Sequence, residues 1–144
     1  MCIRDRVNGN ASGSSIENCY TSGDINAIGG GNAGGIVGKV DGGKLVIKNC
    51  IAWNSMLVST DKAKVGRIVG GTANATYENC YAYDGMILKA GEATFTVSDE
   101  TSPSGSSFQG VAKSANELKN TVINWDSSLW KEGGNGYPVF KWSK

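Results

Sequence analysis

Short runs of alternating apolar and polar residues recur along the chain at intervals of 31 and 30 residues. Three of these runs contain Asn-Cys: "IENCYTSGDI" at 16–25, "IKNCIAWNSM" at 47–56 and "YENCYAYDGM" at 77–86. A second element lies between them, as "GGIVGK" at 34–39 and "GRIVGG" at 66–71. The apolar residues follow period two and not the period of a helix. The pattern therefore predicts a repeat of short β-strands joined by glycine-rich turns.

A repeat made only of strands cannot bury its apolar face alone, so its copies are expected to stack. We predict an all-β fold, a right-handed parallel β-helix (β-solenoid) of about three coils with a small C-terminal α/β cap. The alternative is a β-sandwich with hairpin connections, which predicts antiparallel pairing. In-register stacking of the Asn-Cys pairs would exclude the sandwich.

The inward phase of each run slips by one residue at Asn18, Asn49 and Asn79. A bend at each asparagine explains the slip, because asparagine tolerates the left-handed conformation that a bend often needs. In stacked copies, the three side-chain amides would form a ladder in which each amide bonds the next. These residues are therefore expected to have a structural role.

Cys19, Cys50 and Cys80 follow the asparagines and are expected to form a row of free thiols in the core. Free cysteine behaves as a small buried hydrophobe. A disulfide is the alternative, although parallel side chains on neighbouring strands suit its torsion poorly. We expect no metal site, because the chain has no CxxC spacing and no histidine.

If the cysteines point inward, an aromatic row must point outward. We call Tyr20, Trp53, Tyr81 and Tyr83 the outer aromatic stripe, and they are the candidate ligand-binding residues. Exposed aromatic faces can stack on sugar rings or dock a partner. The alternative, which we favour, is that a C-terminal cap or a missing neighbouring domain covers the stripe.

The chain divides by composition into four parts. Residues 1–6, "MCIRDR", resemble a spurious translated start or a disordered terminus. Residues 7–97 carry the repeats, 98–110 form a polar loop, and 111–144 form an aromatic-rich cap. Within the cap, "SANE" has the form of a capping box and predicts a short helix over about 115–121.

The composition of the chain argues against several classes of function. The formal net charge of +1 gives no reason to expect nucleic acid or an anionic membrane as a partner. The absence of histidine excludes Ser-His-Asp and Cys-His catalysis within this chain. The "GGGNAG" at 29–34 formally matches a dinucleotide motif but lacks a following helix, so no cofactor is expected. Carboxylates such as Asp24, Asp41, Asp61 and Asp84 are interpreted as turn residues, and no catalytic residue is predicted.

At the two recurring elements, the chain resembles a GLUG-motif repeat protein. That repeat runs roughly Gly-Gly-Leu-Val-Gly, a glycine-rich turn, then Ile-x-Asn-Cys-Tyr-Ala-x-Gly. "IENCYTSG" and "YENCYAYDG" match its second part, whereas "IKNCIAWN" departs from it. The resemblance covers about residues 14–90 and implies a bacterial surface or secreted protein, often adhesin-like. Such repeats also occur beside the catalytic domain of immunoglobulin A-cleaving metallopeptidases, but no zinc-ligand motif carries over.

The predicted function is a non-enzymatic repeat module of a bacterial cell-surface or secreted protein, serving as an adhesin or spacer. The first alternative is a carbohydrate-binding module that uses the outer aromatic stripe. The second is a polysaccharide-acting enzyme, which would need a carboxylate pair beside a base such as Arg67. Expected partners are glycans, host surface proteins and neighbouring segments of a longer chain, at an extracellular or cell-surface location.

Overall fold

The computed structural model describes residues 4–8, 14–27, 29–41, 45–71, 75–102 and 107–143. Short strands dominate this part of the chain, together with one α-helix and one 3-10 turn at Lys62–Lys64. The elements are β1 (Arg4–Asn8), β2 (Ser14–Glu17), β3 (Tyr20–Ser22), β4 (Ile25–Asn26), β5 (Ala33–Gly34), β6 (Val37–Asp41), β7 (Leu45–Lys48), β8 (Ile51–Trp53), β9 (Met56–Ser59), β10 (Val65–Gly66), β11 (Val69–Gly71), β12 (Ala75–Glu78), β13 (Tyr81–Tyr83), β14 (Ile87–Ala90), β15 (Ala93–Phe95), β16 (Val111–Lys113), α1 (Ala115–Trp125), β17 (Trp130–Glu132) and β18 (Pro138–Phe140).

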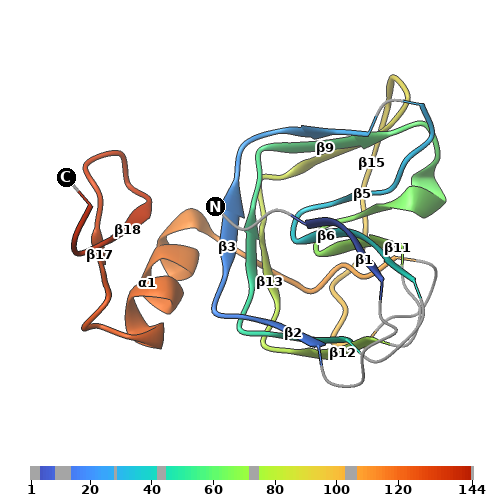
Figure 1. Cartoon of the computed structure of the whole chain (residues 1–144). Coiled ribbons are helices and arrows are strands. Elements are labelled where there is room, and N and C mark those ends of the chain that lie inside the picture. The colour runs from blue at the N-terminus through green and yellow to red at the C-terminus, as the bar shows by residue number, and fades with distance from the viewer. Residues whose placement is uncertain are drawn as a thin grey trace.

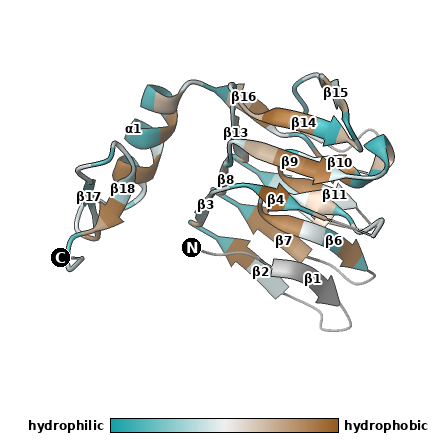
Figure 2. Cartoon of the chain, turned by 90° about the horizontal axis from the view of Figure 1, so that it is seen from above, coloured by the Kyte–Doolittle hydropathy of each residue, from teal (hydrophilic) through white to brown (hydrophobic). Residues whose placement is uncertain are grey.

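Equivalent strands of successive repeats pair in parallel and in register. β2, β7 and β12 form one sheet, in which Ile16, Ile47 and Tyr77 are aligned. β3, β8, β13 and β16 form a second sheet, and β4, β9 and β14 belong to a third. Figures 1 and 2 show these strands lying beside their equivalents. This parallel pairing excludes the β-sandwich with hairpin connections.

The predicted right-handed parallel β-helix of about three coils is wrong. The described strands form several small, mostly parallel sheets and not one continuous β-helix. Antiparallel pairs interrupt the pattern at β14–β15 and at β17–β18. The first departure has a local cause: Gly91, with φ of 62°, turns the chain back before β15, so the third repeat does not continue as the first two do. The all-β class remains, with α1 as the one described α-helix.

The core lies between the sheets and is lined by small and β-branched side chains. Thr21, Ala52 and Ala82 stack in register and have no exposed surface. Ile36 and Ile68 are also buried. Small residues at the stacked positions allow the sheets to approach closely, which is why the inward row after each cysteine is never bulky.

The C-terminal segment, residues 114–143, packs on the outward face of the second sheet and not on the end of the stack (Figure 1). The Ser114 hydroxyl accepts from the Glu117 backbone N–H, and the Glu117 carboxylate accepts from the Ser114 N–H, so the predicted capping box is confirmed. α1 extends to Trp125 and buries Leu118 and Val122, one turn apart, against β8 and β13.

The described residues of the predicted polar loop, 98–102 and 107–110, lie at the end of the stack. Phe108 is 1% exposed, and its ring stacks on Tyr77 with the ring centroids 3.9 Å apart. The Phe108 carbonyl accepts from the backbone N–H groups of Ile68 and Val69, each at 3.1 Å. One layer below, the Ile68 carbonyl accepts in the same way from Ile36 and Val37. The loop thus supplies the backbone acceptor that a third Gly-Ile-Val-Gly element would have supplied.

Candidate functional site

The three Asn-Cys turns bring the predicted asparagines together. Asn18, Asn49 and Asn79 have φ values of 53°, 50° and 50°, which is the left-handed region. The Asn49 amide donates to Asn18 Oδ1 and the Asn79 amide donates to Asn49 Oδ1, each over 3.1 Å. The bonds run in one direction, so the Asn18 Nδ2 group has no acceptor among the described residues.

The cysteine row lies directly inside these turns. Cys50 is fully buried, Cys80 is buried and Cys19 is partly exposed, and Cys50 and Cys80 are free thiols. The Cys50 thiol donates to the Ile16 carbonyl at 3.4 Å, and the Cys80 thiol repeats this bond one layer further on. Burial raises the pKa of Cys80 to about 11. A protonated, enclosed thiol is a poor nucleophile, so Cys80 is not placed as a reactive thiol.

The outer aromatic stripe is covered by the C-terminal segment and does not form an open face. Trp53 is only 5% exposed, and its ring lies 4.8 Å from that of Tyr137. The Tyr20 hydroxyl donates to the Pro138 carbonyl, and burial raises the pKa of Tyr20. Tyr81 and Tyr83 are half-buried in the same cluster. The chain's own segment therefore packs on Tyr20 and Trp53, which is the kind of cover that the sequence analysis favoured, and a ligand-binding role for the four residues stays a prediction.

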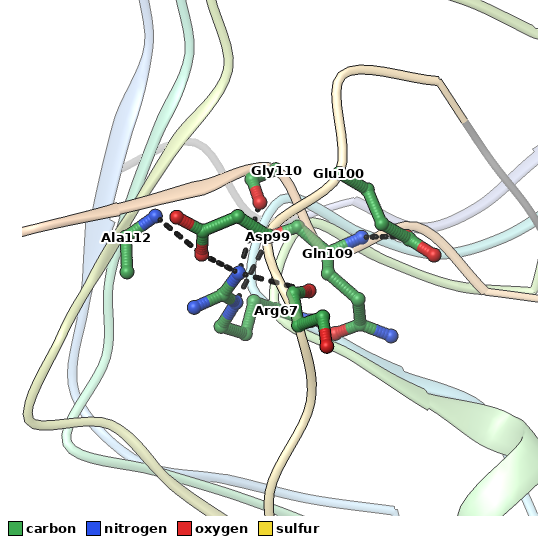
Figure 3. A network of polar contacts seen from close by, with 7 residues as sticks. Arg67, Asp99, Glu100, Gln109, Gly110 and Ala112 are labelled. Atoms are coloured by element: carbon green, nitrogen blue, oxygen red, sulfur yellow. Dashed lines mark hydrogen bonds and ion pairs between the residues drawn. The ribbon is translucent and has the colours of Figure 1, made fainter.

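A buried arginine organises the loop that covers the end of the stack (Figure 3). Arg67 is 7% exposed and donates to the carbonyls of Gln109 and Gly110 at 3.0 and 2.9 Å. It also pairs with Asp99 at 2.8 Å, and this hydrogen bond holds the pKa of the Asp99 carboxyl below its ordinary value. Asp99 accepts in addition from the Ala112 N–H. Arg67 is thus committed to internal partners, which does not fit the exposed base of a polysaccharide-acting enzyme.

A cavity of about 310 Å³ lies beside this loop, against Tyr77, Asn79 and Glu100. The Tyr77 hydroxyl is buried and makes no hydrogen bond with the described residues. Burial strongly raises the pKa of this group, so it stays protonated. Phe108 covers one face of the Tyr77 ring, which leaves only part of the side chain to line the cavity.

A second cleft is open and aromatic. We define the aromatic cleft as the 250 Å³ cavity lined by Asn18, Cys19, Tyr20, Trp130, Val139, Phe140 and Ser143. Trp130, Phe140 and Trp142 stack beside it, with centroid distances of 4.2 and 4.4 Å. Sequence reasoning missed this cleft because it assigned the aromatic residues of "GYPVFKW" entirely to a cap. The alternation of residues in that stretch places one aromatic side chain outward, and this pattern could have indicated an exposed aromatic surface.

Metal-binding and membrane-spanning features are not found in the part of the chain that the structure describes. No group of three or more Cys, Asp or Glu side chains there is placed to hold a metal ion. Among the same residues, no helix is long and apolar enough to cross a membrane.

No family model matches the chain. No curated protein matches it either. Among solved structures, the chain is similar to a protein described as a "putative immunoglobulin A1 protease" from Bacteroides ovatus, with a TM-score of 0.88 and 44% sequence identity. The match covers 98% of this chain and 45% of that protein, so this chain spans less than half of its length.

This match corrects the prediction that the chain is not an enzyme. The similar protein is described as a protease, which points toward an enzyme, and the identity of 44% is high enough that the likeness reaches beyond the fold. The chain has no histidine, and its described thiols at Cys50 and Cys80 are buried.

Proposed function

We propose that this chain is a recognition segment of a longer bacterial secreted or cell-surface protease that acts on immunoglobulin A1. The observation that carries the proposal is the 44% identity across nearly the whole chain to less than half of a protein described as acting in this way. In this proposal the chain binds or positions the antibody. Groups such as histidine, which the chain lacks, come from the remainder of the longer protein.

The geometry supports recognition through the C-terminal segment. A contiguous patch of exposed apolar side chains, unlike single exposed ones, is typical of a site where a partner or ligand binds. Three of the four large, exposed apolar side chains among the described residues lie in this segment: Leu129 at 41%, Phe140 at 36% and Trp142 at 66%. The repeats below it form a rigid, in-register base, on which a recognition surface keeps its shape.

The location and partners follow from the same proposal. An antibody substrate is extracellular, so the longer protein is secreted or displayed on the cell surface. Host surface proteins, glycans and neighbouring segments of the longer protein are the expected partners. The resemblance to GLUG-motif repeats stays a prediction that agrees with such a location.

Binding of the purified chain to immobilised human immunoglobulin A1, measured by biolayer interferometry, tests the proposal. We expect saturable binding to immunoglobulin A1 and none to immunoglobulin G. The unfolded Cys50→Asp variant is the control for binding that needs the fold. Equal binding to both antibodies, or none to either, would contradict the proposal.

A cleavage assay with the same antibody separates recognition from chemistry. The longer protein is expected to cleave immunoglobulin A1 into fragments that gel electrophoresis resolves. Cleavage by the 144-residue chain alone would place the catalytic groups within it and contradict the division of roles proposed here.

A second candidate function is that of a structural spacer between other parts of the longer protein. The close packing of Trp53 against Tyr137 of the C-terminal segment favours it, because this packing uses the aromatic side chains of that face for an internal contact. The test is to delete the residues of this chain from the longer protein. Loss of cleavage of all substrates, and not of immunoglobulin A1 alone, would support this second candidate.

A further inference from the structure

The three strands of the third Asn-Cys repeat differ in what lies beyond them. β16 pairs with the outer edge of β13, and β15 pairs with the outer edge of β14. β12 lies at the edge of its sheet and pairs only with β7 among the described residues. An unpaired strand edge is a template on which another extended segment can pair. The edge of β12 is therefore the open position in this layer.

The backbone N–H groups of the repeated turn show the direction in which this edge points. The Asn18 N–H donates to the Lys48 carbonyl, and the Asn49 N–H donates to the Glu78 carbonyl, each one layer further on. The Asn79 N–H is the next donor in this series. It has no backbone acceptor among the described residues, so it faces the missing layer.

The carbonyl groups of the same strands point in the same direction. The Cys50 thiol donates to the Ile16 carbonyl, and the Cys80 thiol donates to the Ile47 carbonyl, so each carbonyl faces the following layer. Tyr77 is aligned with Ile16 and Ile47. Its carbonyl therefore faces the open edge, where it can accept a hydrogen bond from an added strand.

The cavity of about 310 Å³ described above lies along this edge. Tyr77, Glu78 and Asn79 line it from the strand, and Glu100 and Phe108 line it from the covering loop. The Phe108 ring already stacks on the Tyr77 ring at 3.9 Å. A large side chain beside Tyr77 would overpack this contact, so an added strand needs a small residue there.

The neighbours of β12 exclude a second copy of this chain as the occupant. In a head-to-tail stack, β3 of the second copy would have to pair with β13, whose outer edge β16 already occupies. Phe108 occupies the edge at Val69 in the same way. The opening therefore accepts one extended segment and not another stack of repeats.

The charge row beside the edge specifies one residue of that segment. Glu17, Lys48 and Glu78 are aligned in successive layers and alternate in charge, and Lys48 pairs with Glu78 at 3.0 Å. The Glu78 side chain is 54% exposed, and the two charged residues that line the cavity, Glu78 and Glu100, are both acidic. Opposite charges on adjacent strands stabilise their pairing, so a lysine or arginine continues this row.

The asparagine ladder specifies a second residue. The Asn49 amide donates to Asn18, and the Asn79 amide donates to Asn49. Asn79 Oδ1 is the next acceptor in the series and receives no hydrogen bond from the described residues. An asparagine in the added segment can donate to it as Asn79 donates to Asn49.

We propose that the edge of β12 binds an extended segment of a partner protein in parallel. This segment has a small residue beside Tyr77, a lysine or arginine beside Glu78 and an asparagine beside Asn79. In such strand addition the backbone bonds supply affinity and the side chains supply specificity. The inference goes beyond the proposed function and does not depend on it.

Fluorescence anisotropy of a labelled peptide, Val-Thr-Ala-Lys-Asn-Gly with blocked ends, tests the proposal on the whole chain. We expect a dissociation constant on the order of 0.1 mM. Successive residues of a parallel strand bond to opposite sides, so the lysine N–H of the peptide should bond the Tyr77 carbonyl and the alanine N–H should face away. N-methylation at the lysine should weaken binding at least about tenfold, whereas N-methylation at the alanine should leave it unchanged.

Charge reversal tests the contact with Glu78. Glu78→Lys should weaken binding of the lysine peptide about tenfold and should favour a peptide with glutamate in place of the lysine. Glu17→Lys is the matched control, because Glu17 is aligned with the same Lys48 but lies at the opposite end of the row. Binding of both peptides should be unchanged in this variant.

A matched pair of glycine variants tests the ladder acceptor. Asn79→Gly and Asn18→Gly each lose one ladder bond and keep a residue that tolerates positive φ. Only Asn79→Gly removes the oxygen that faces the open edge, so only this variant should weaken peptide binding. Thermal melting checks that the variants fold, and the two N-methylated peptides test the proposal on the unaltered protein.

The proposal is overturned if the peptide does not bind, if both N-methylated peptides bind equally, or if Glu17→Lys weakens binding as much as Glu78→Lys. Self-association of the chain that the peptide disrupts, measured by analytical ultracentrifugation, would assign the edge to a second copy and would also overturn it. A chain that binds immunoglobulin A1 but not the peptide would overturn this inference alone. The reverse result would overturn the proposed function alone.

Discussion

The two kinds of turn in the repeat are completed in different ways. The Asn-Cys turn occurs three times in the sequence, and the three copies stack with φ values of 53°, 50° and 50° and are joined by two equivalent side-chain bonds. The Gly-Ile-Val-Gly element occurs twice, and its third position is filled by Phe108 from an unrelated loop. There an antiparallel bridge joins Val69 to Phe108, where the lower layers pair in parallel.

The difference shows that the backbone of an unrelated segment can fill a stacked position without repeating the sequence of the layers below. Gly35 donates its N–H to the Arg67 carbonyl, whereas Arg67 donates its N–H to the side-chain Oε1 of Gln109. A side-chain amide thus replaces a backbone carbonyl. The end of the stack is closed by atoms that satisfy the same donors, which is the physical requirement at any buried edge.

The largest expected effect tests the repeated turn. Cys50→Asp places a carboxylate where the exposed fraction is zero, and the carbonyl oxygens of Ile16 and Lys48 that face the thiol cannot donate to it. An unpaired buried charge costs several kcal/mol, so we expect no cooperative thermal unfolding transition in circular dichroism.

Cys19→Asp is the control for Cys50→Asp, because Cys19 occupies the same row but is partly exposed. That variant should keep a cooperative transition at a lower temperature. A soluble Cys50→Asp variant that melts cooperatively would show that the row does not lie in the core.

The next effect tests the position that is not repeated in the sequence. Phe108→Ala removes a ring that is 1% exposed and stacked on Tyr77. Loss of burial and the resulting cavity should lower the free energy of unfolding by about 3–5 kcal/mol, measured by urea denaturation. Phe140→Ala, at a residue that is 36% exposed, should cost about 1 kcal/mol. Equal effects at the two positions would mean that the loop does not close the stack.

The sequence predicted the turns that repeat and missed those that do not. The phase slip at Asn18, Asn49 and Asn79 was visible because three copies share it. The role of Phe108 was not visible, because its neighbours in "SSFQG" match nothing in the repeat and its function depends on contacts with Val69 and Tyr77, which are distant in sequence.

The outer aromatic stripe and the aromatic cleft also differ in how much of each could be predicted from the sequence. The outward phase of the outer aromatic stripe followed from alternation within each repeat, but what covers it did not. Packing between the stripe and the C-terminal segment is a contact between separate elements, and periodicity carries no information about it. The aromatic cleft was missed for this reason: it joins the Asn18 turn to Trp130 and Phe140, more than one hundred residues away.

Asn49 allows the backbone and side-chain contributions of the repeated turn to be separated. Asn49→Ala loses both ladder bonds and places an alanine at φ of 50°, so the free energy of unfolding should fall by about 2 kcal/mol. Asn49→Gly loses the same bonds without the left-handed cost, and should lose about 1 kcal/mol. Chemical denaturation of the two variants measures the difference. If they are equally stable, the conformation of the turn is not what asparagine provides.

The smallest effect concerns the polar contacts of the covering loop and depends on pH. The Asp99 pKa is lowered from its ordinary 3.8 in the folded state, first by the hydrogen bond from Arg67. The unfolded state therefore binds more protons as the pH falls, so this contribution is present above pH 3.8 and is lost as the pH falls through the lower folded value. Asp99 is half exposed, so the contribution is about 1 kcal/mol.

Asp99→Asn should remove this contribution at neutral pH and flatten the acid side of the stability curve, measured by denaturation between about pH 3 and pH 7. Asp61→Asn is the control, because the Asp61 carboxylate caps the 3-10 turn and has no arginine partner among the residues that the structure describes. It should leave the Arg67-dependent part of the curve in place. A wild-type curve whose acid side matches that of Asp99→Asn would mean that the end of the stack is held by Phe108 and the backbone bonds alone, with the ion pair contributing nothing to closure.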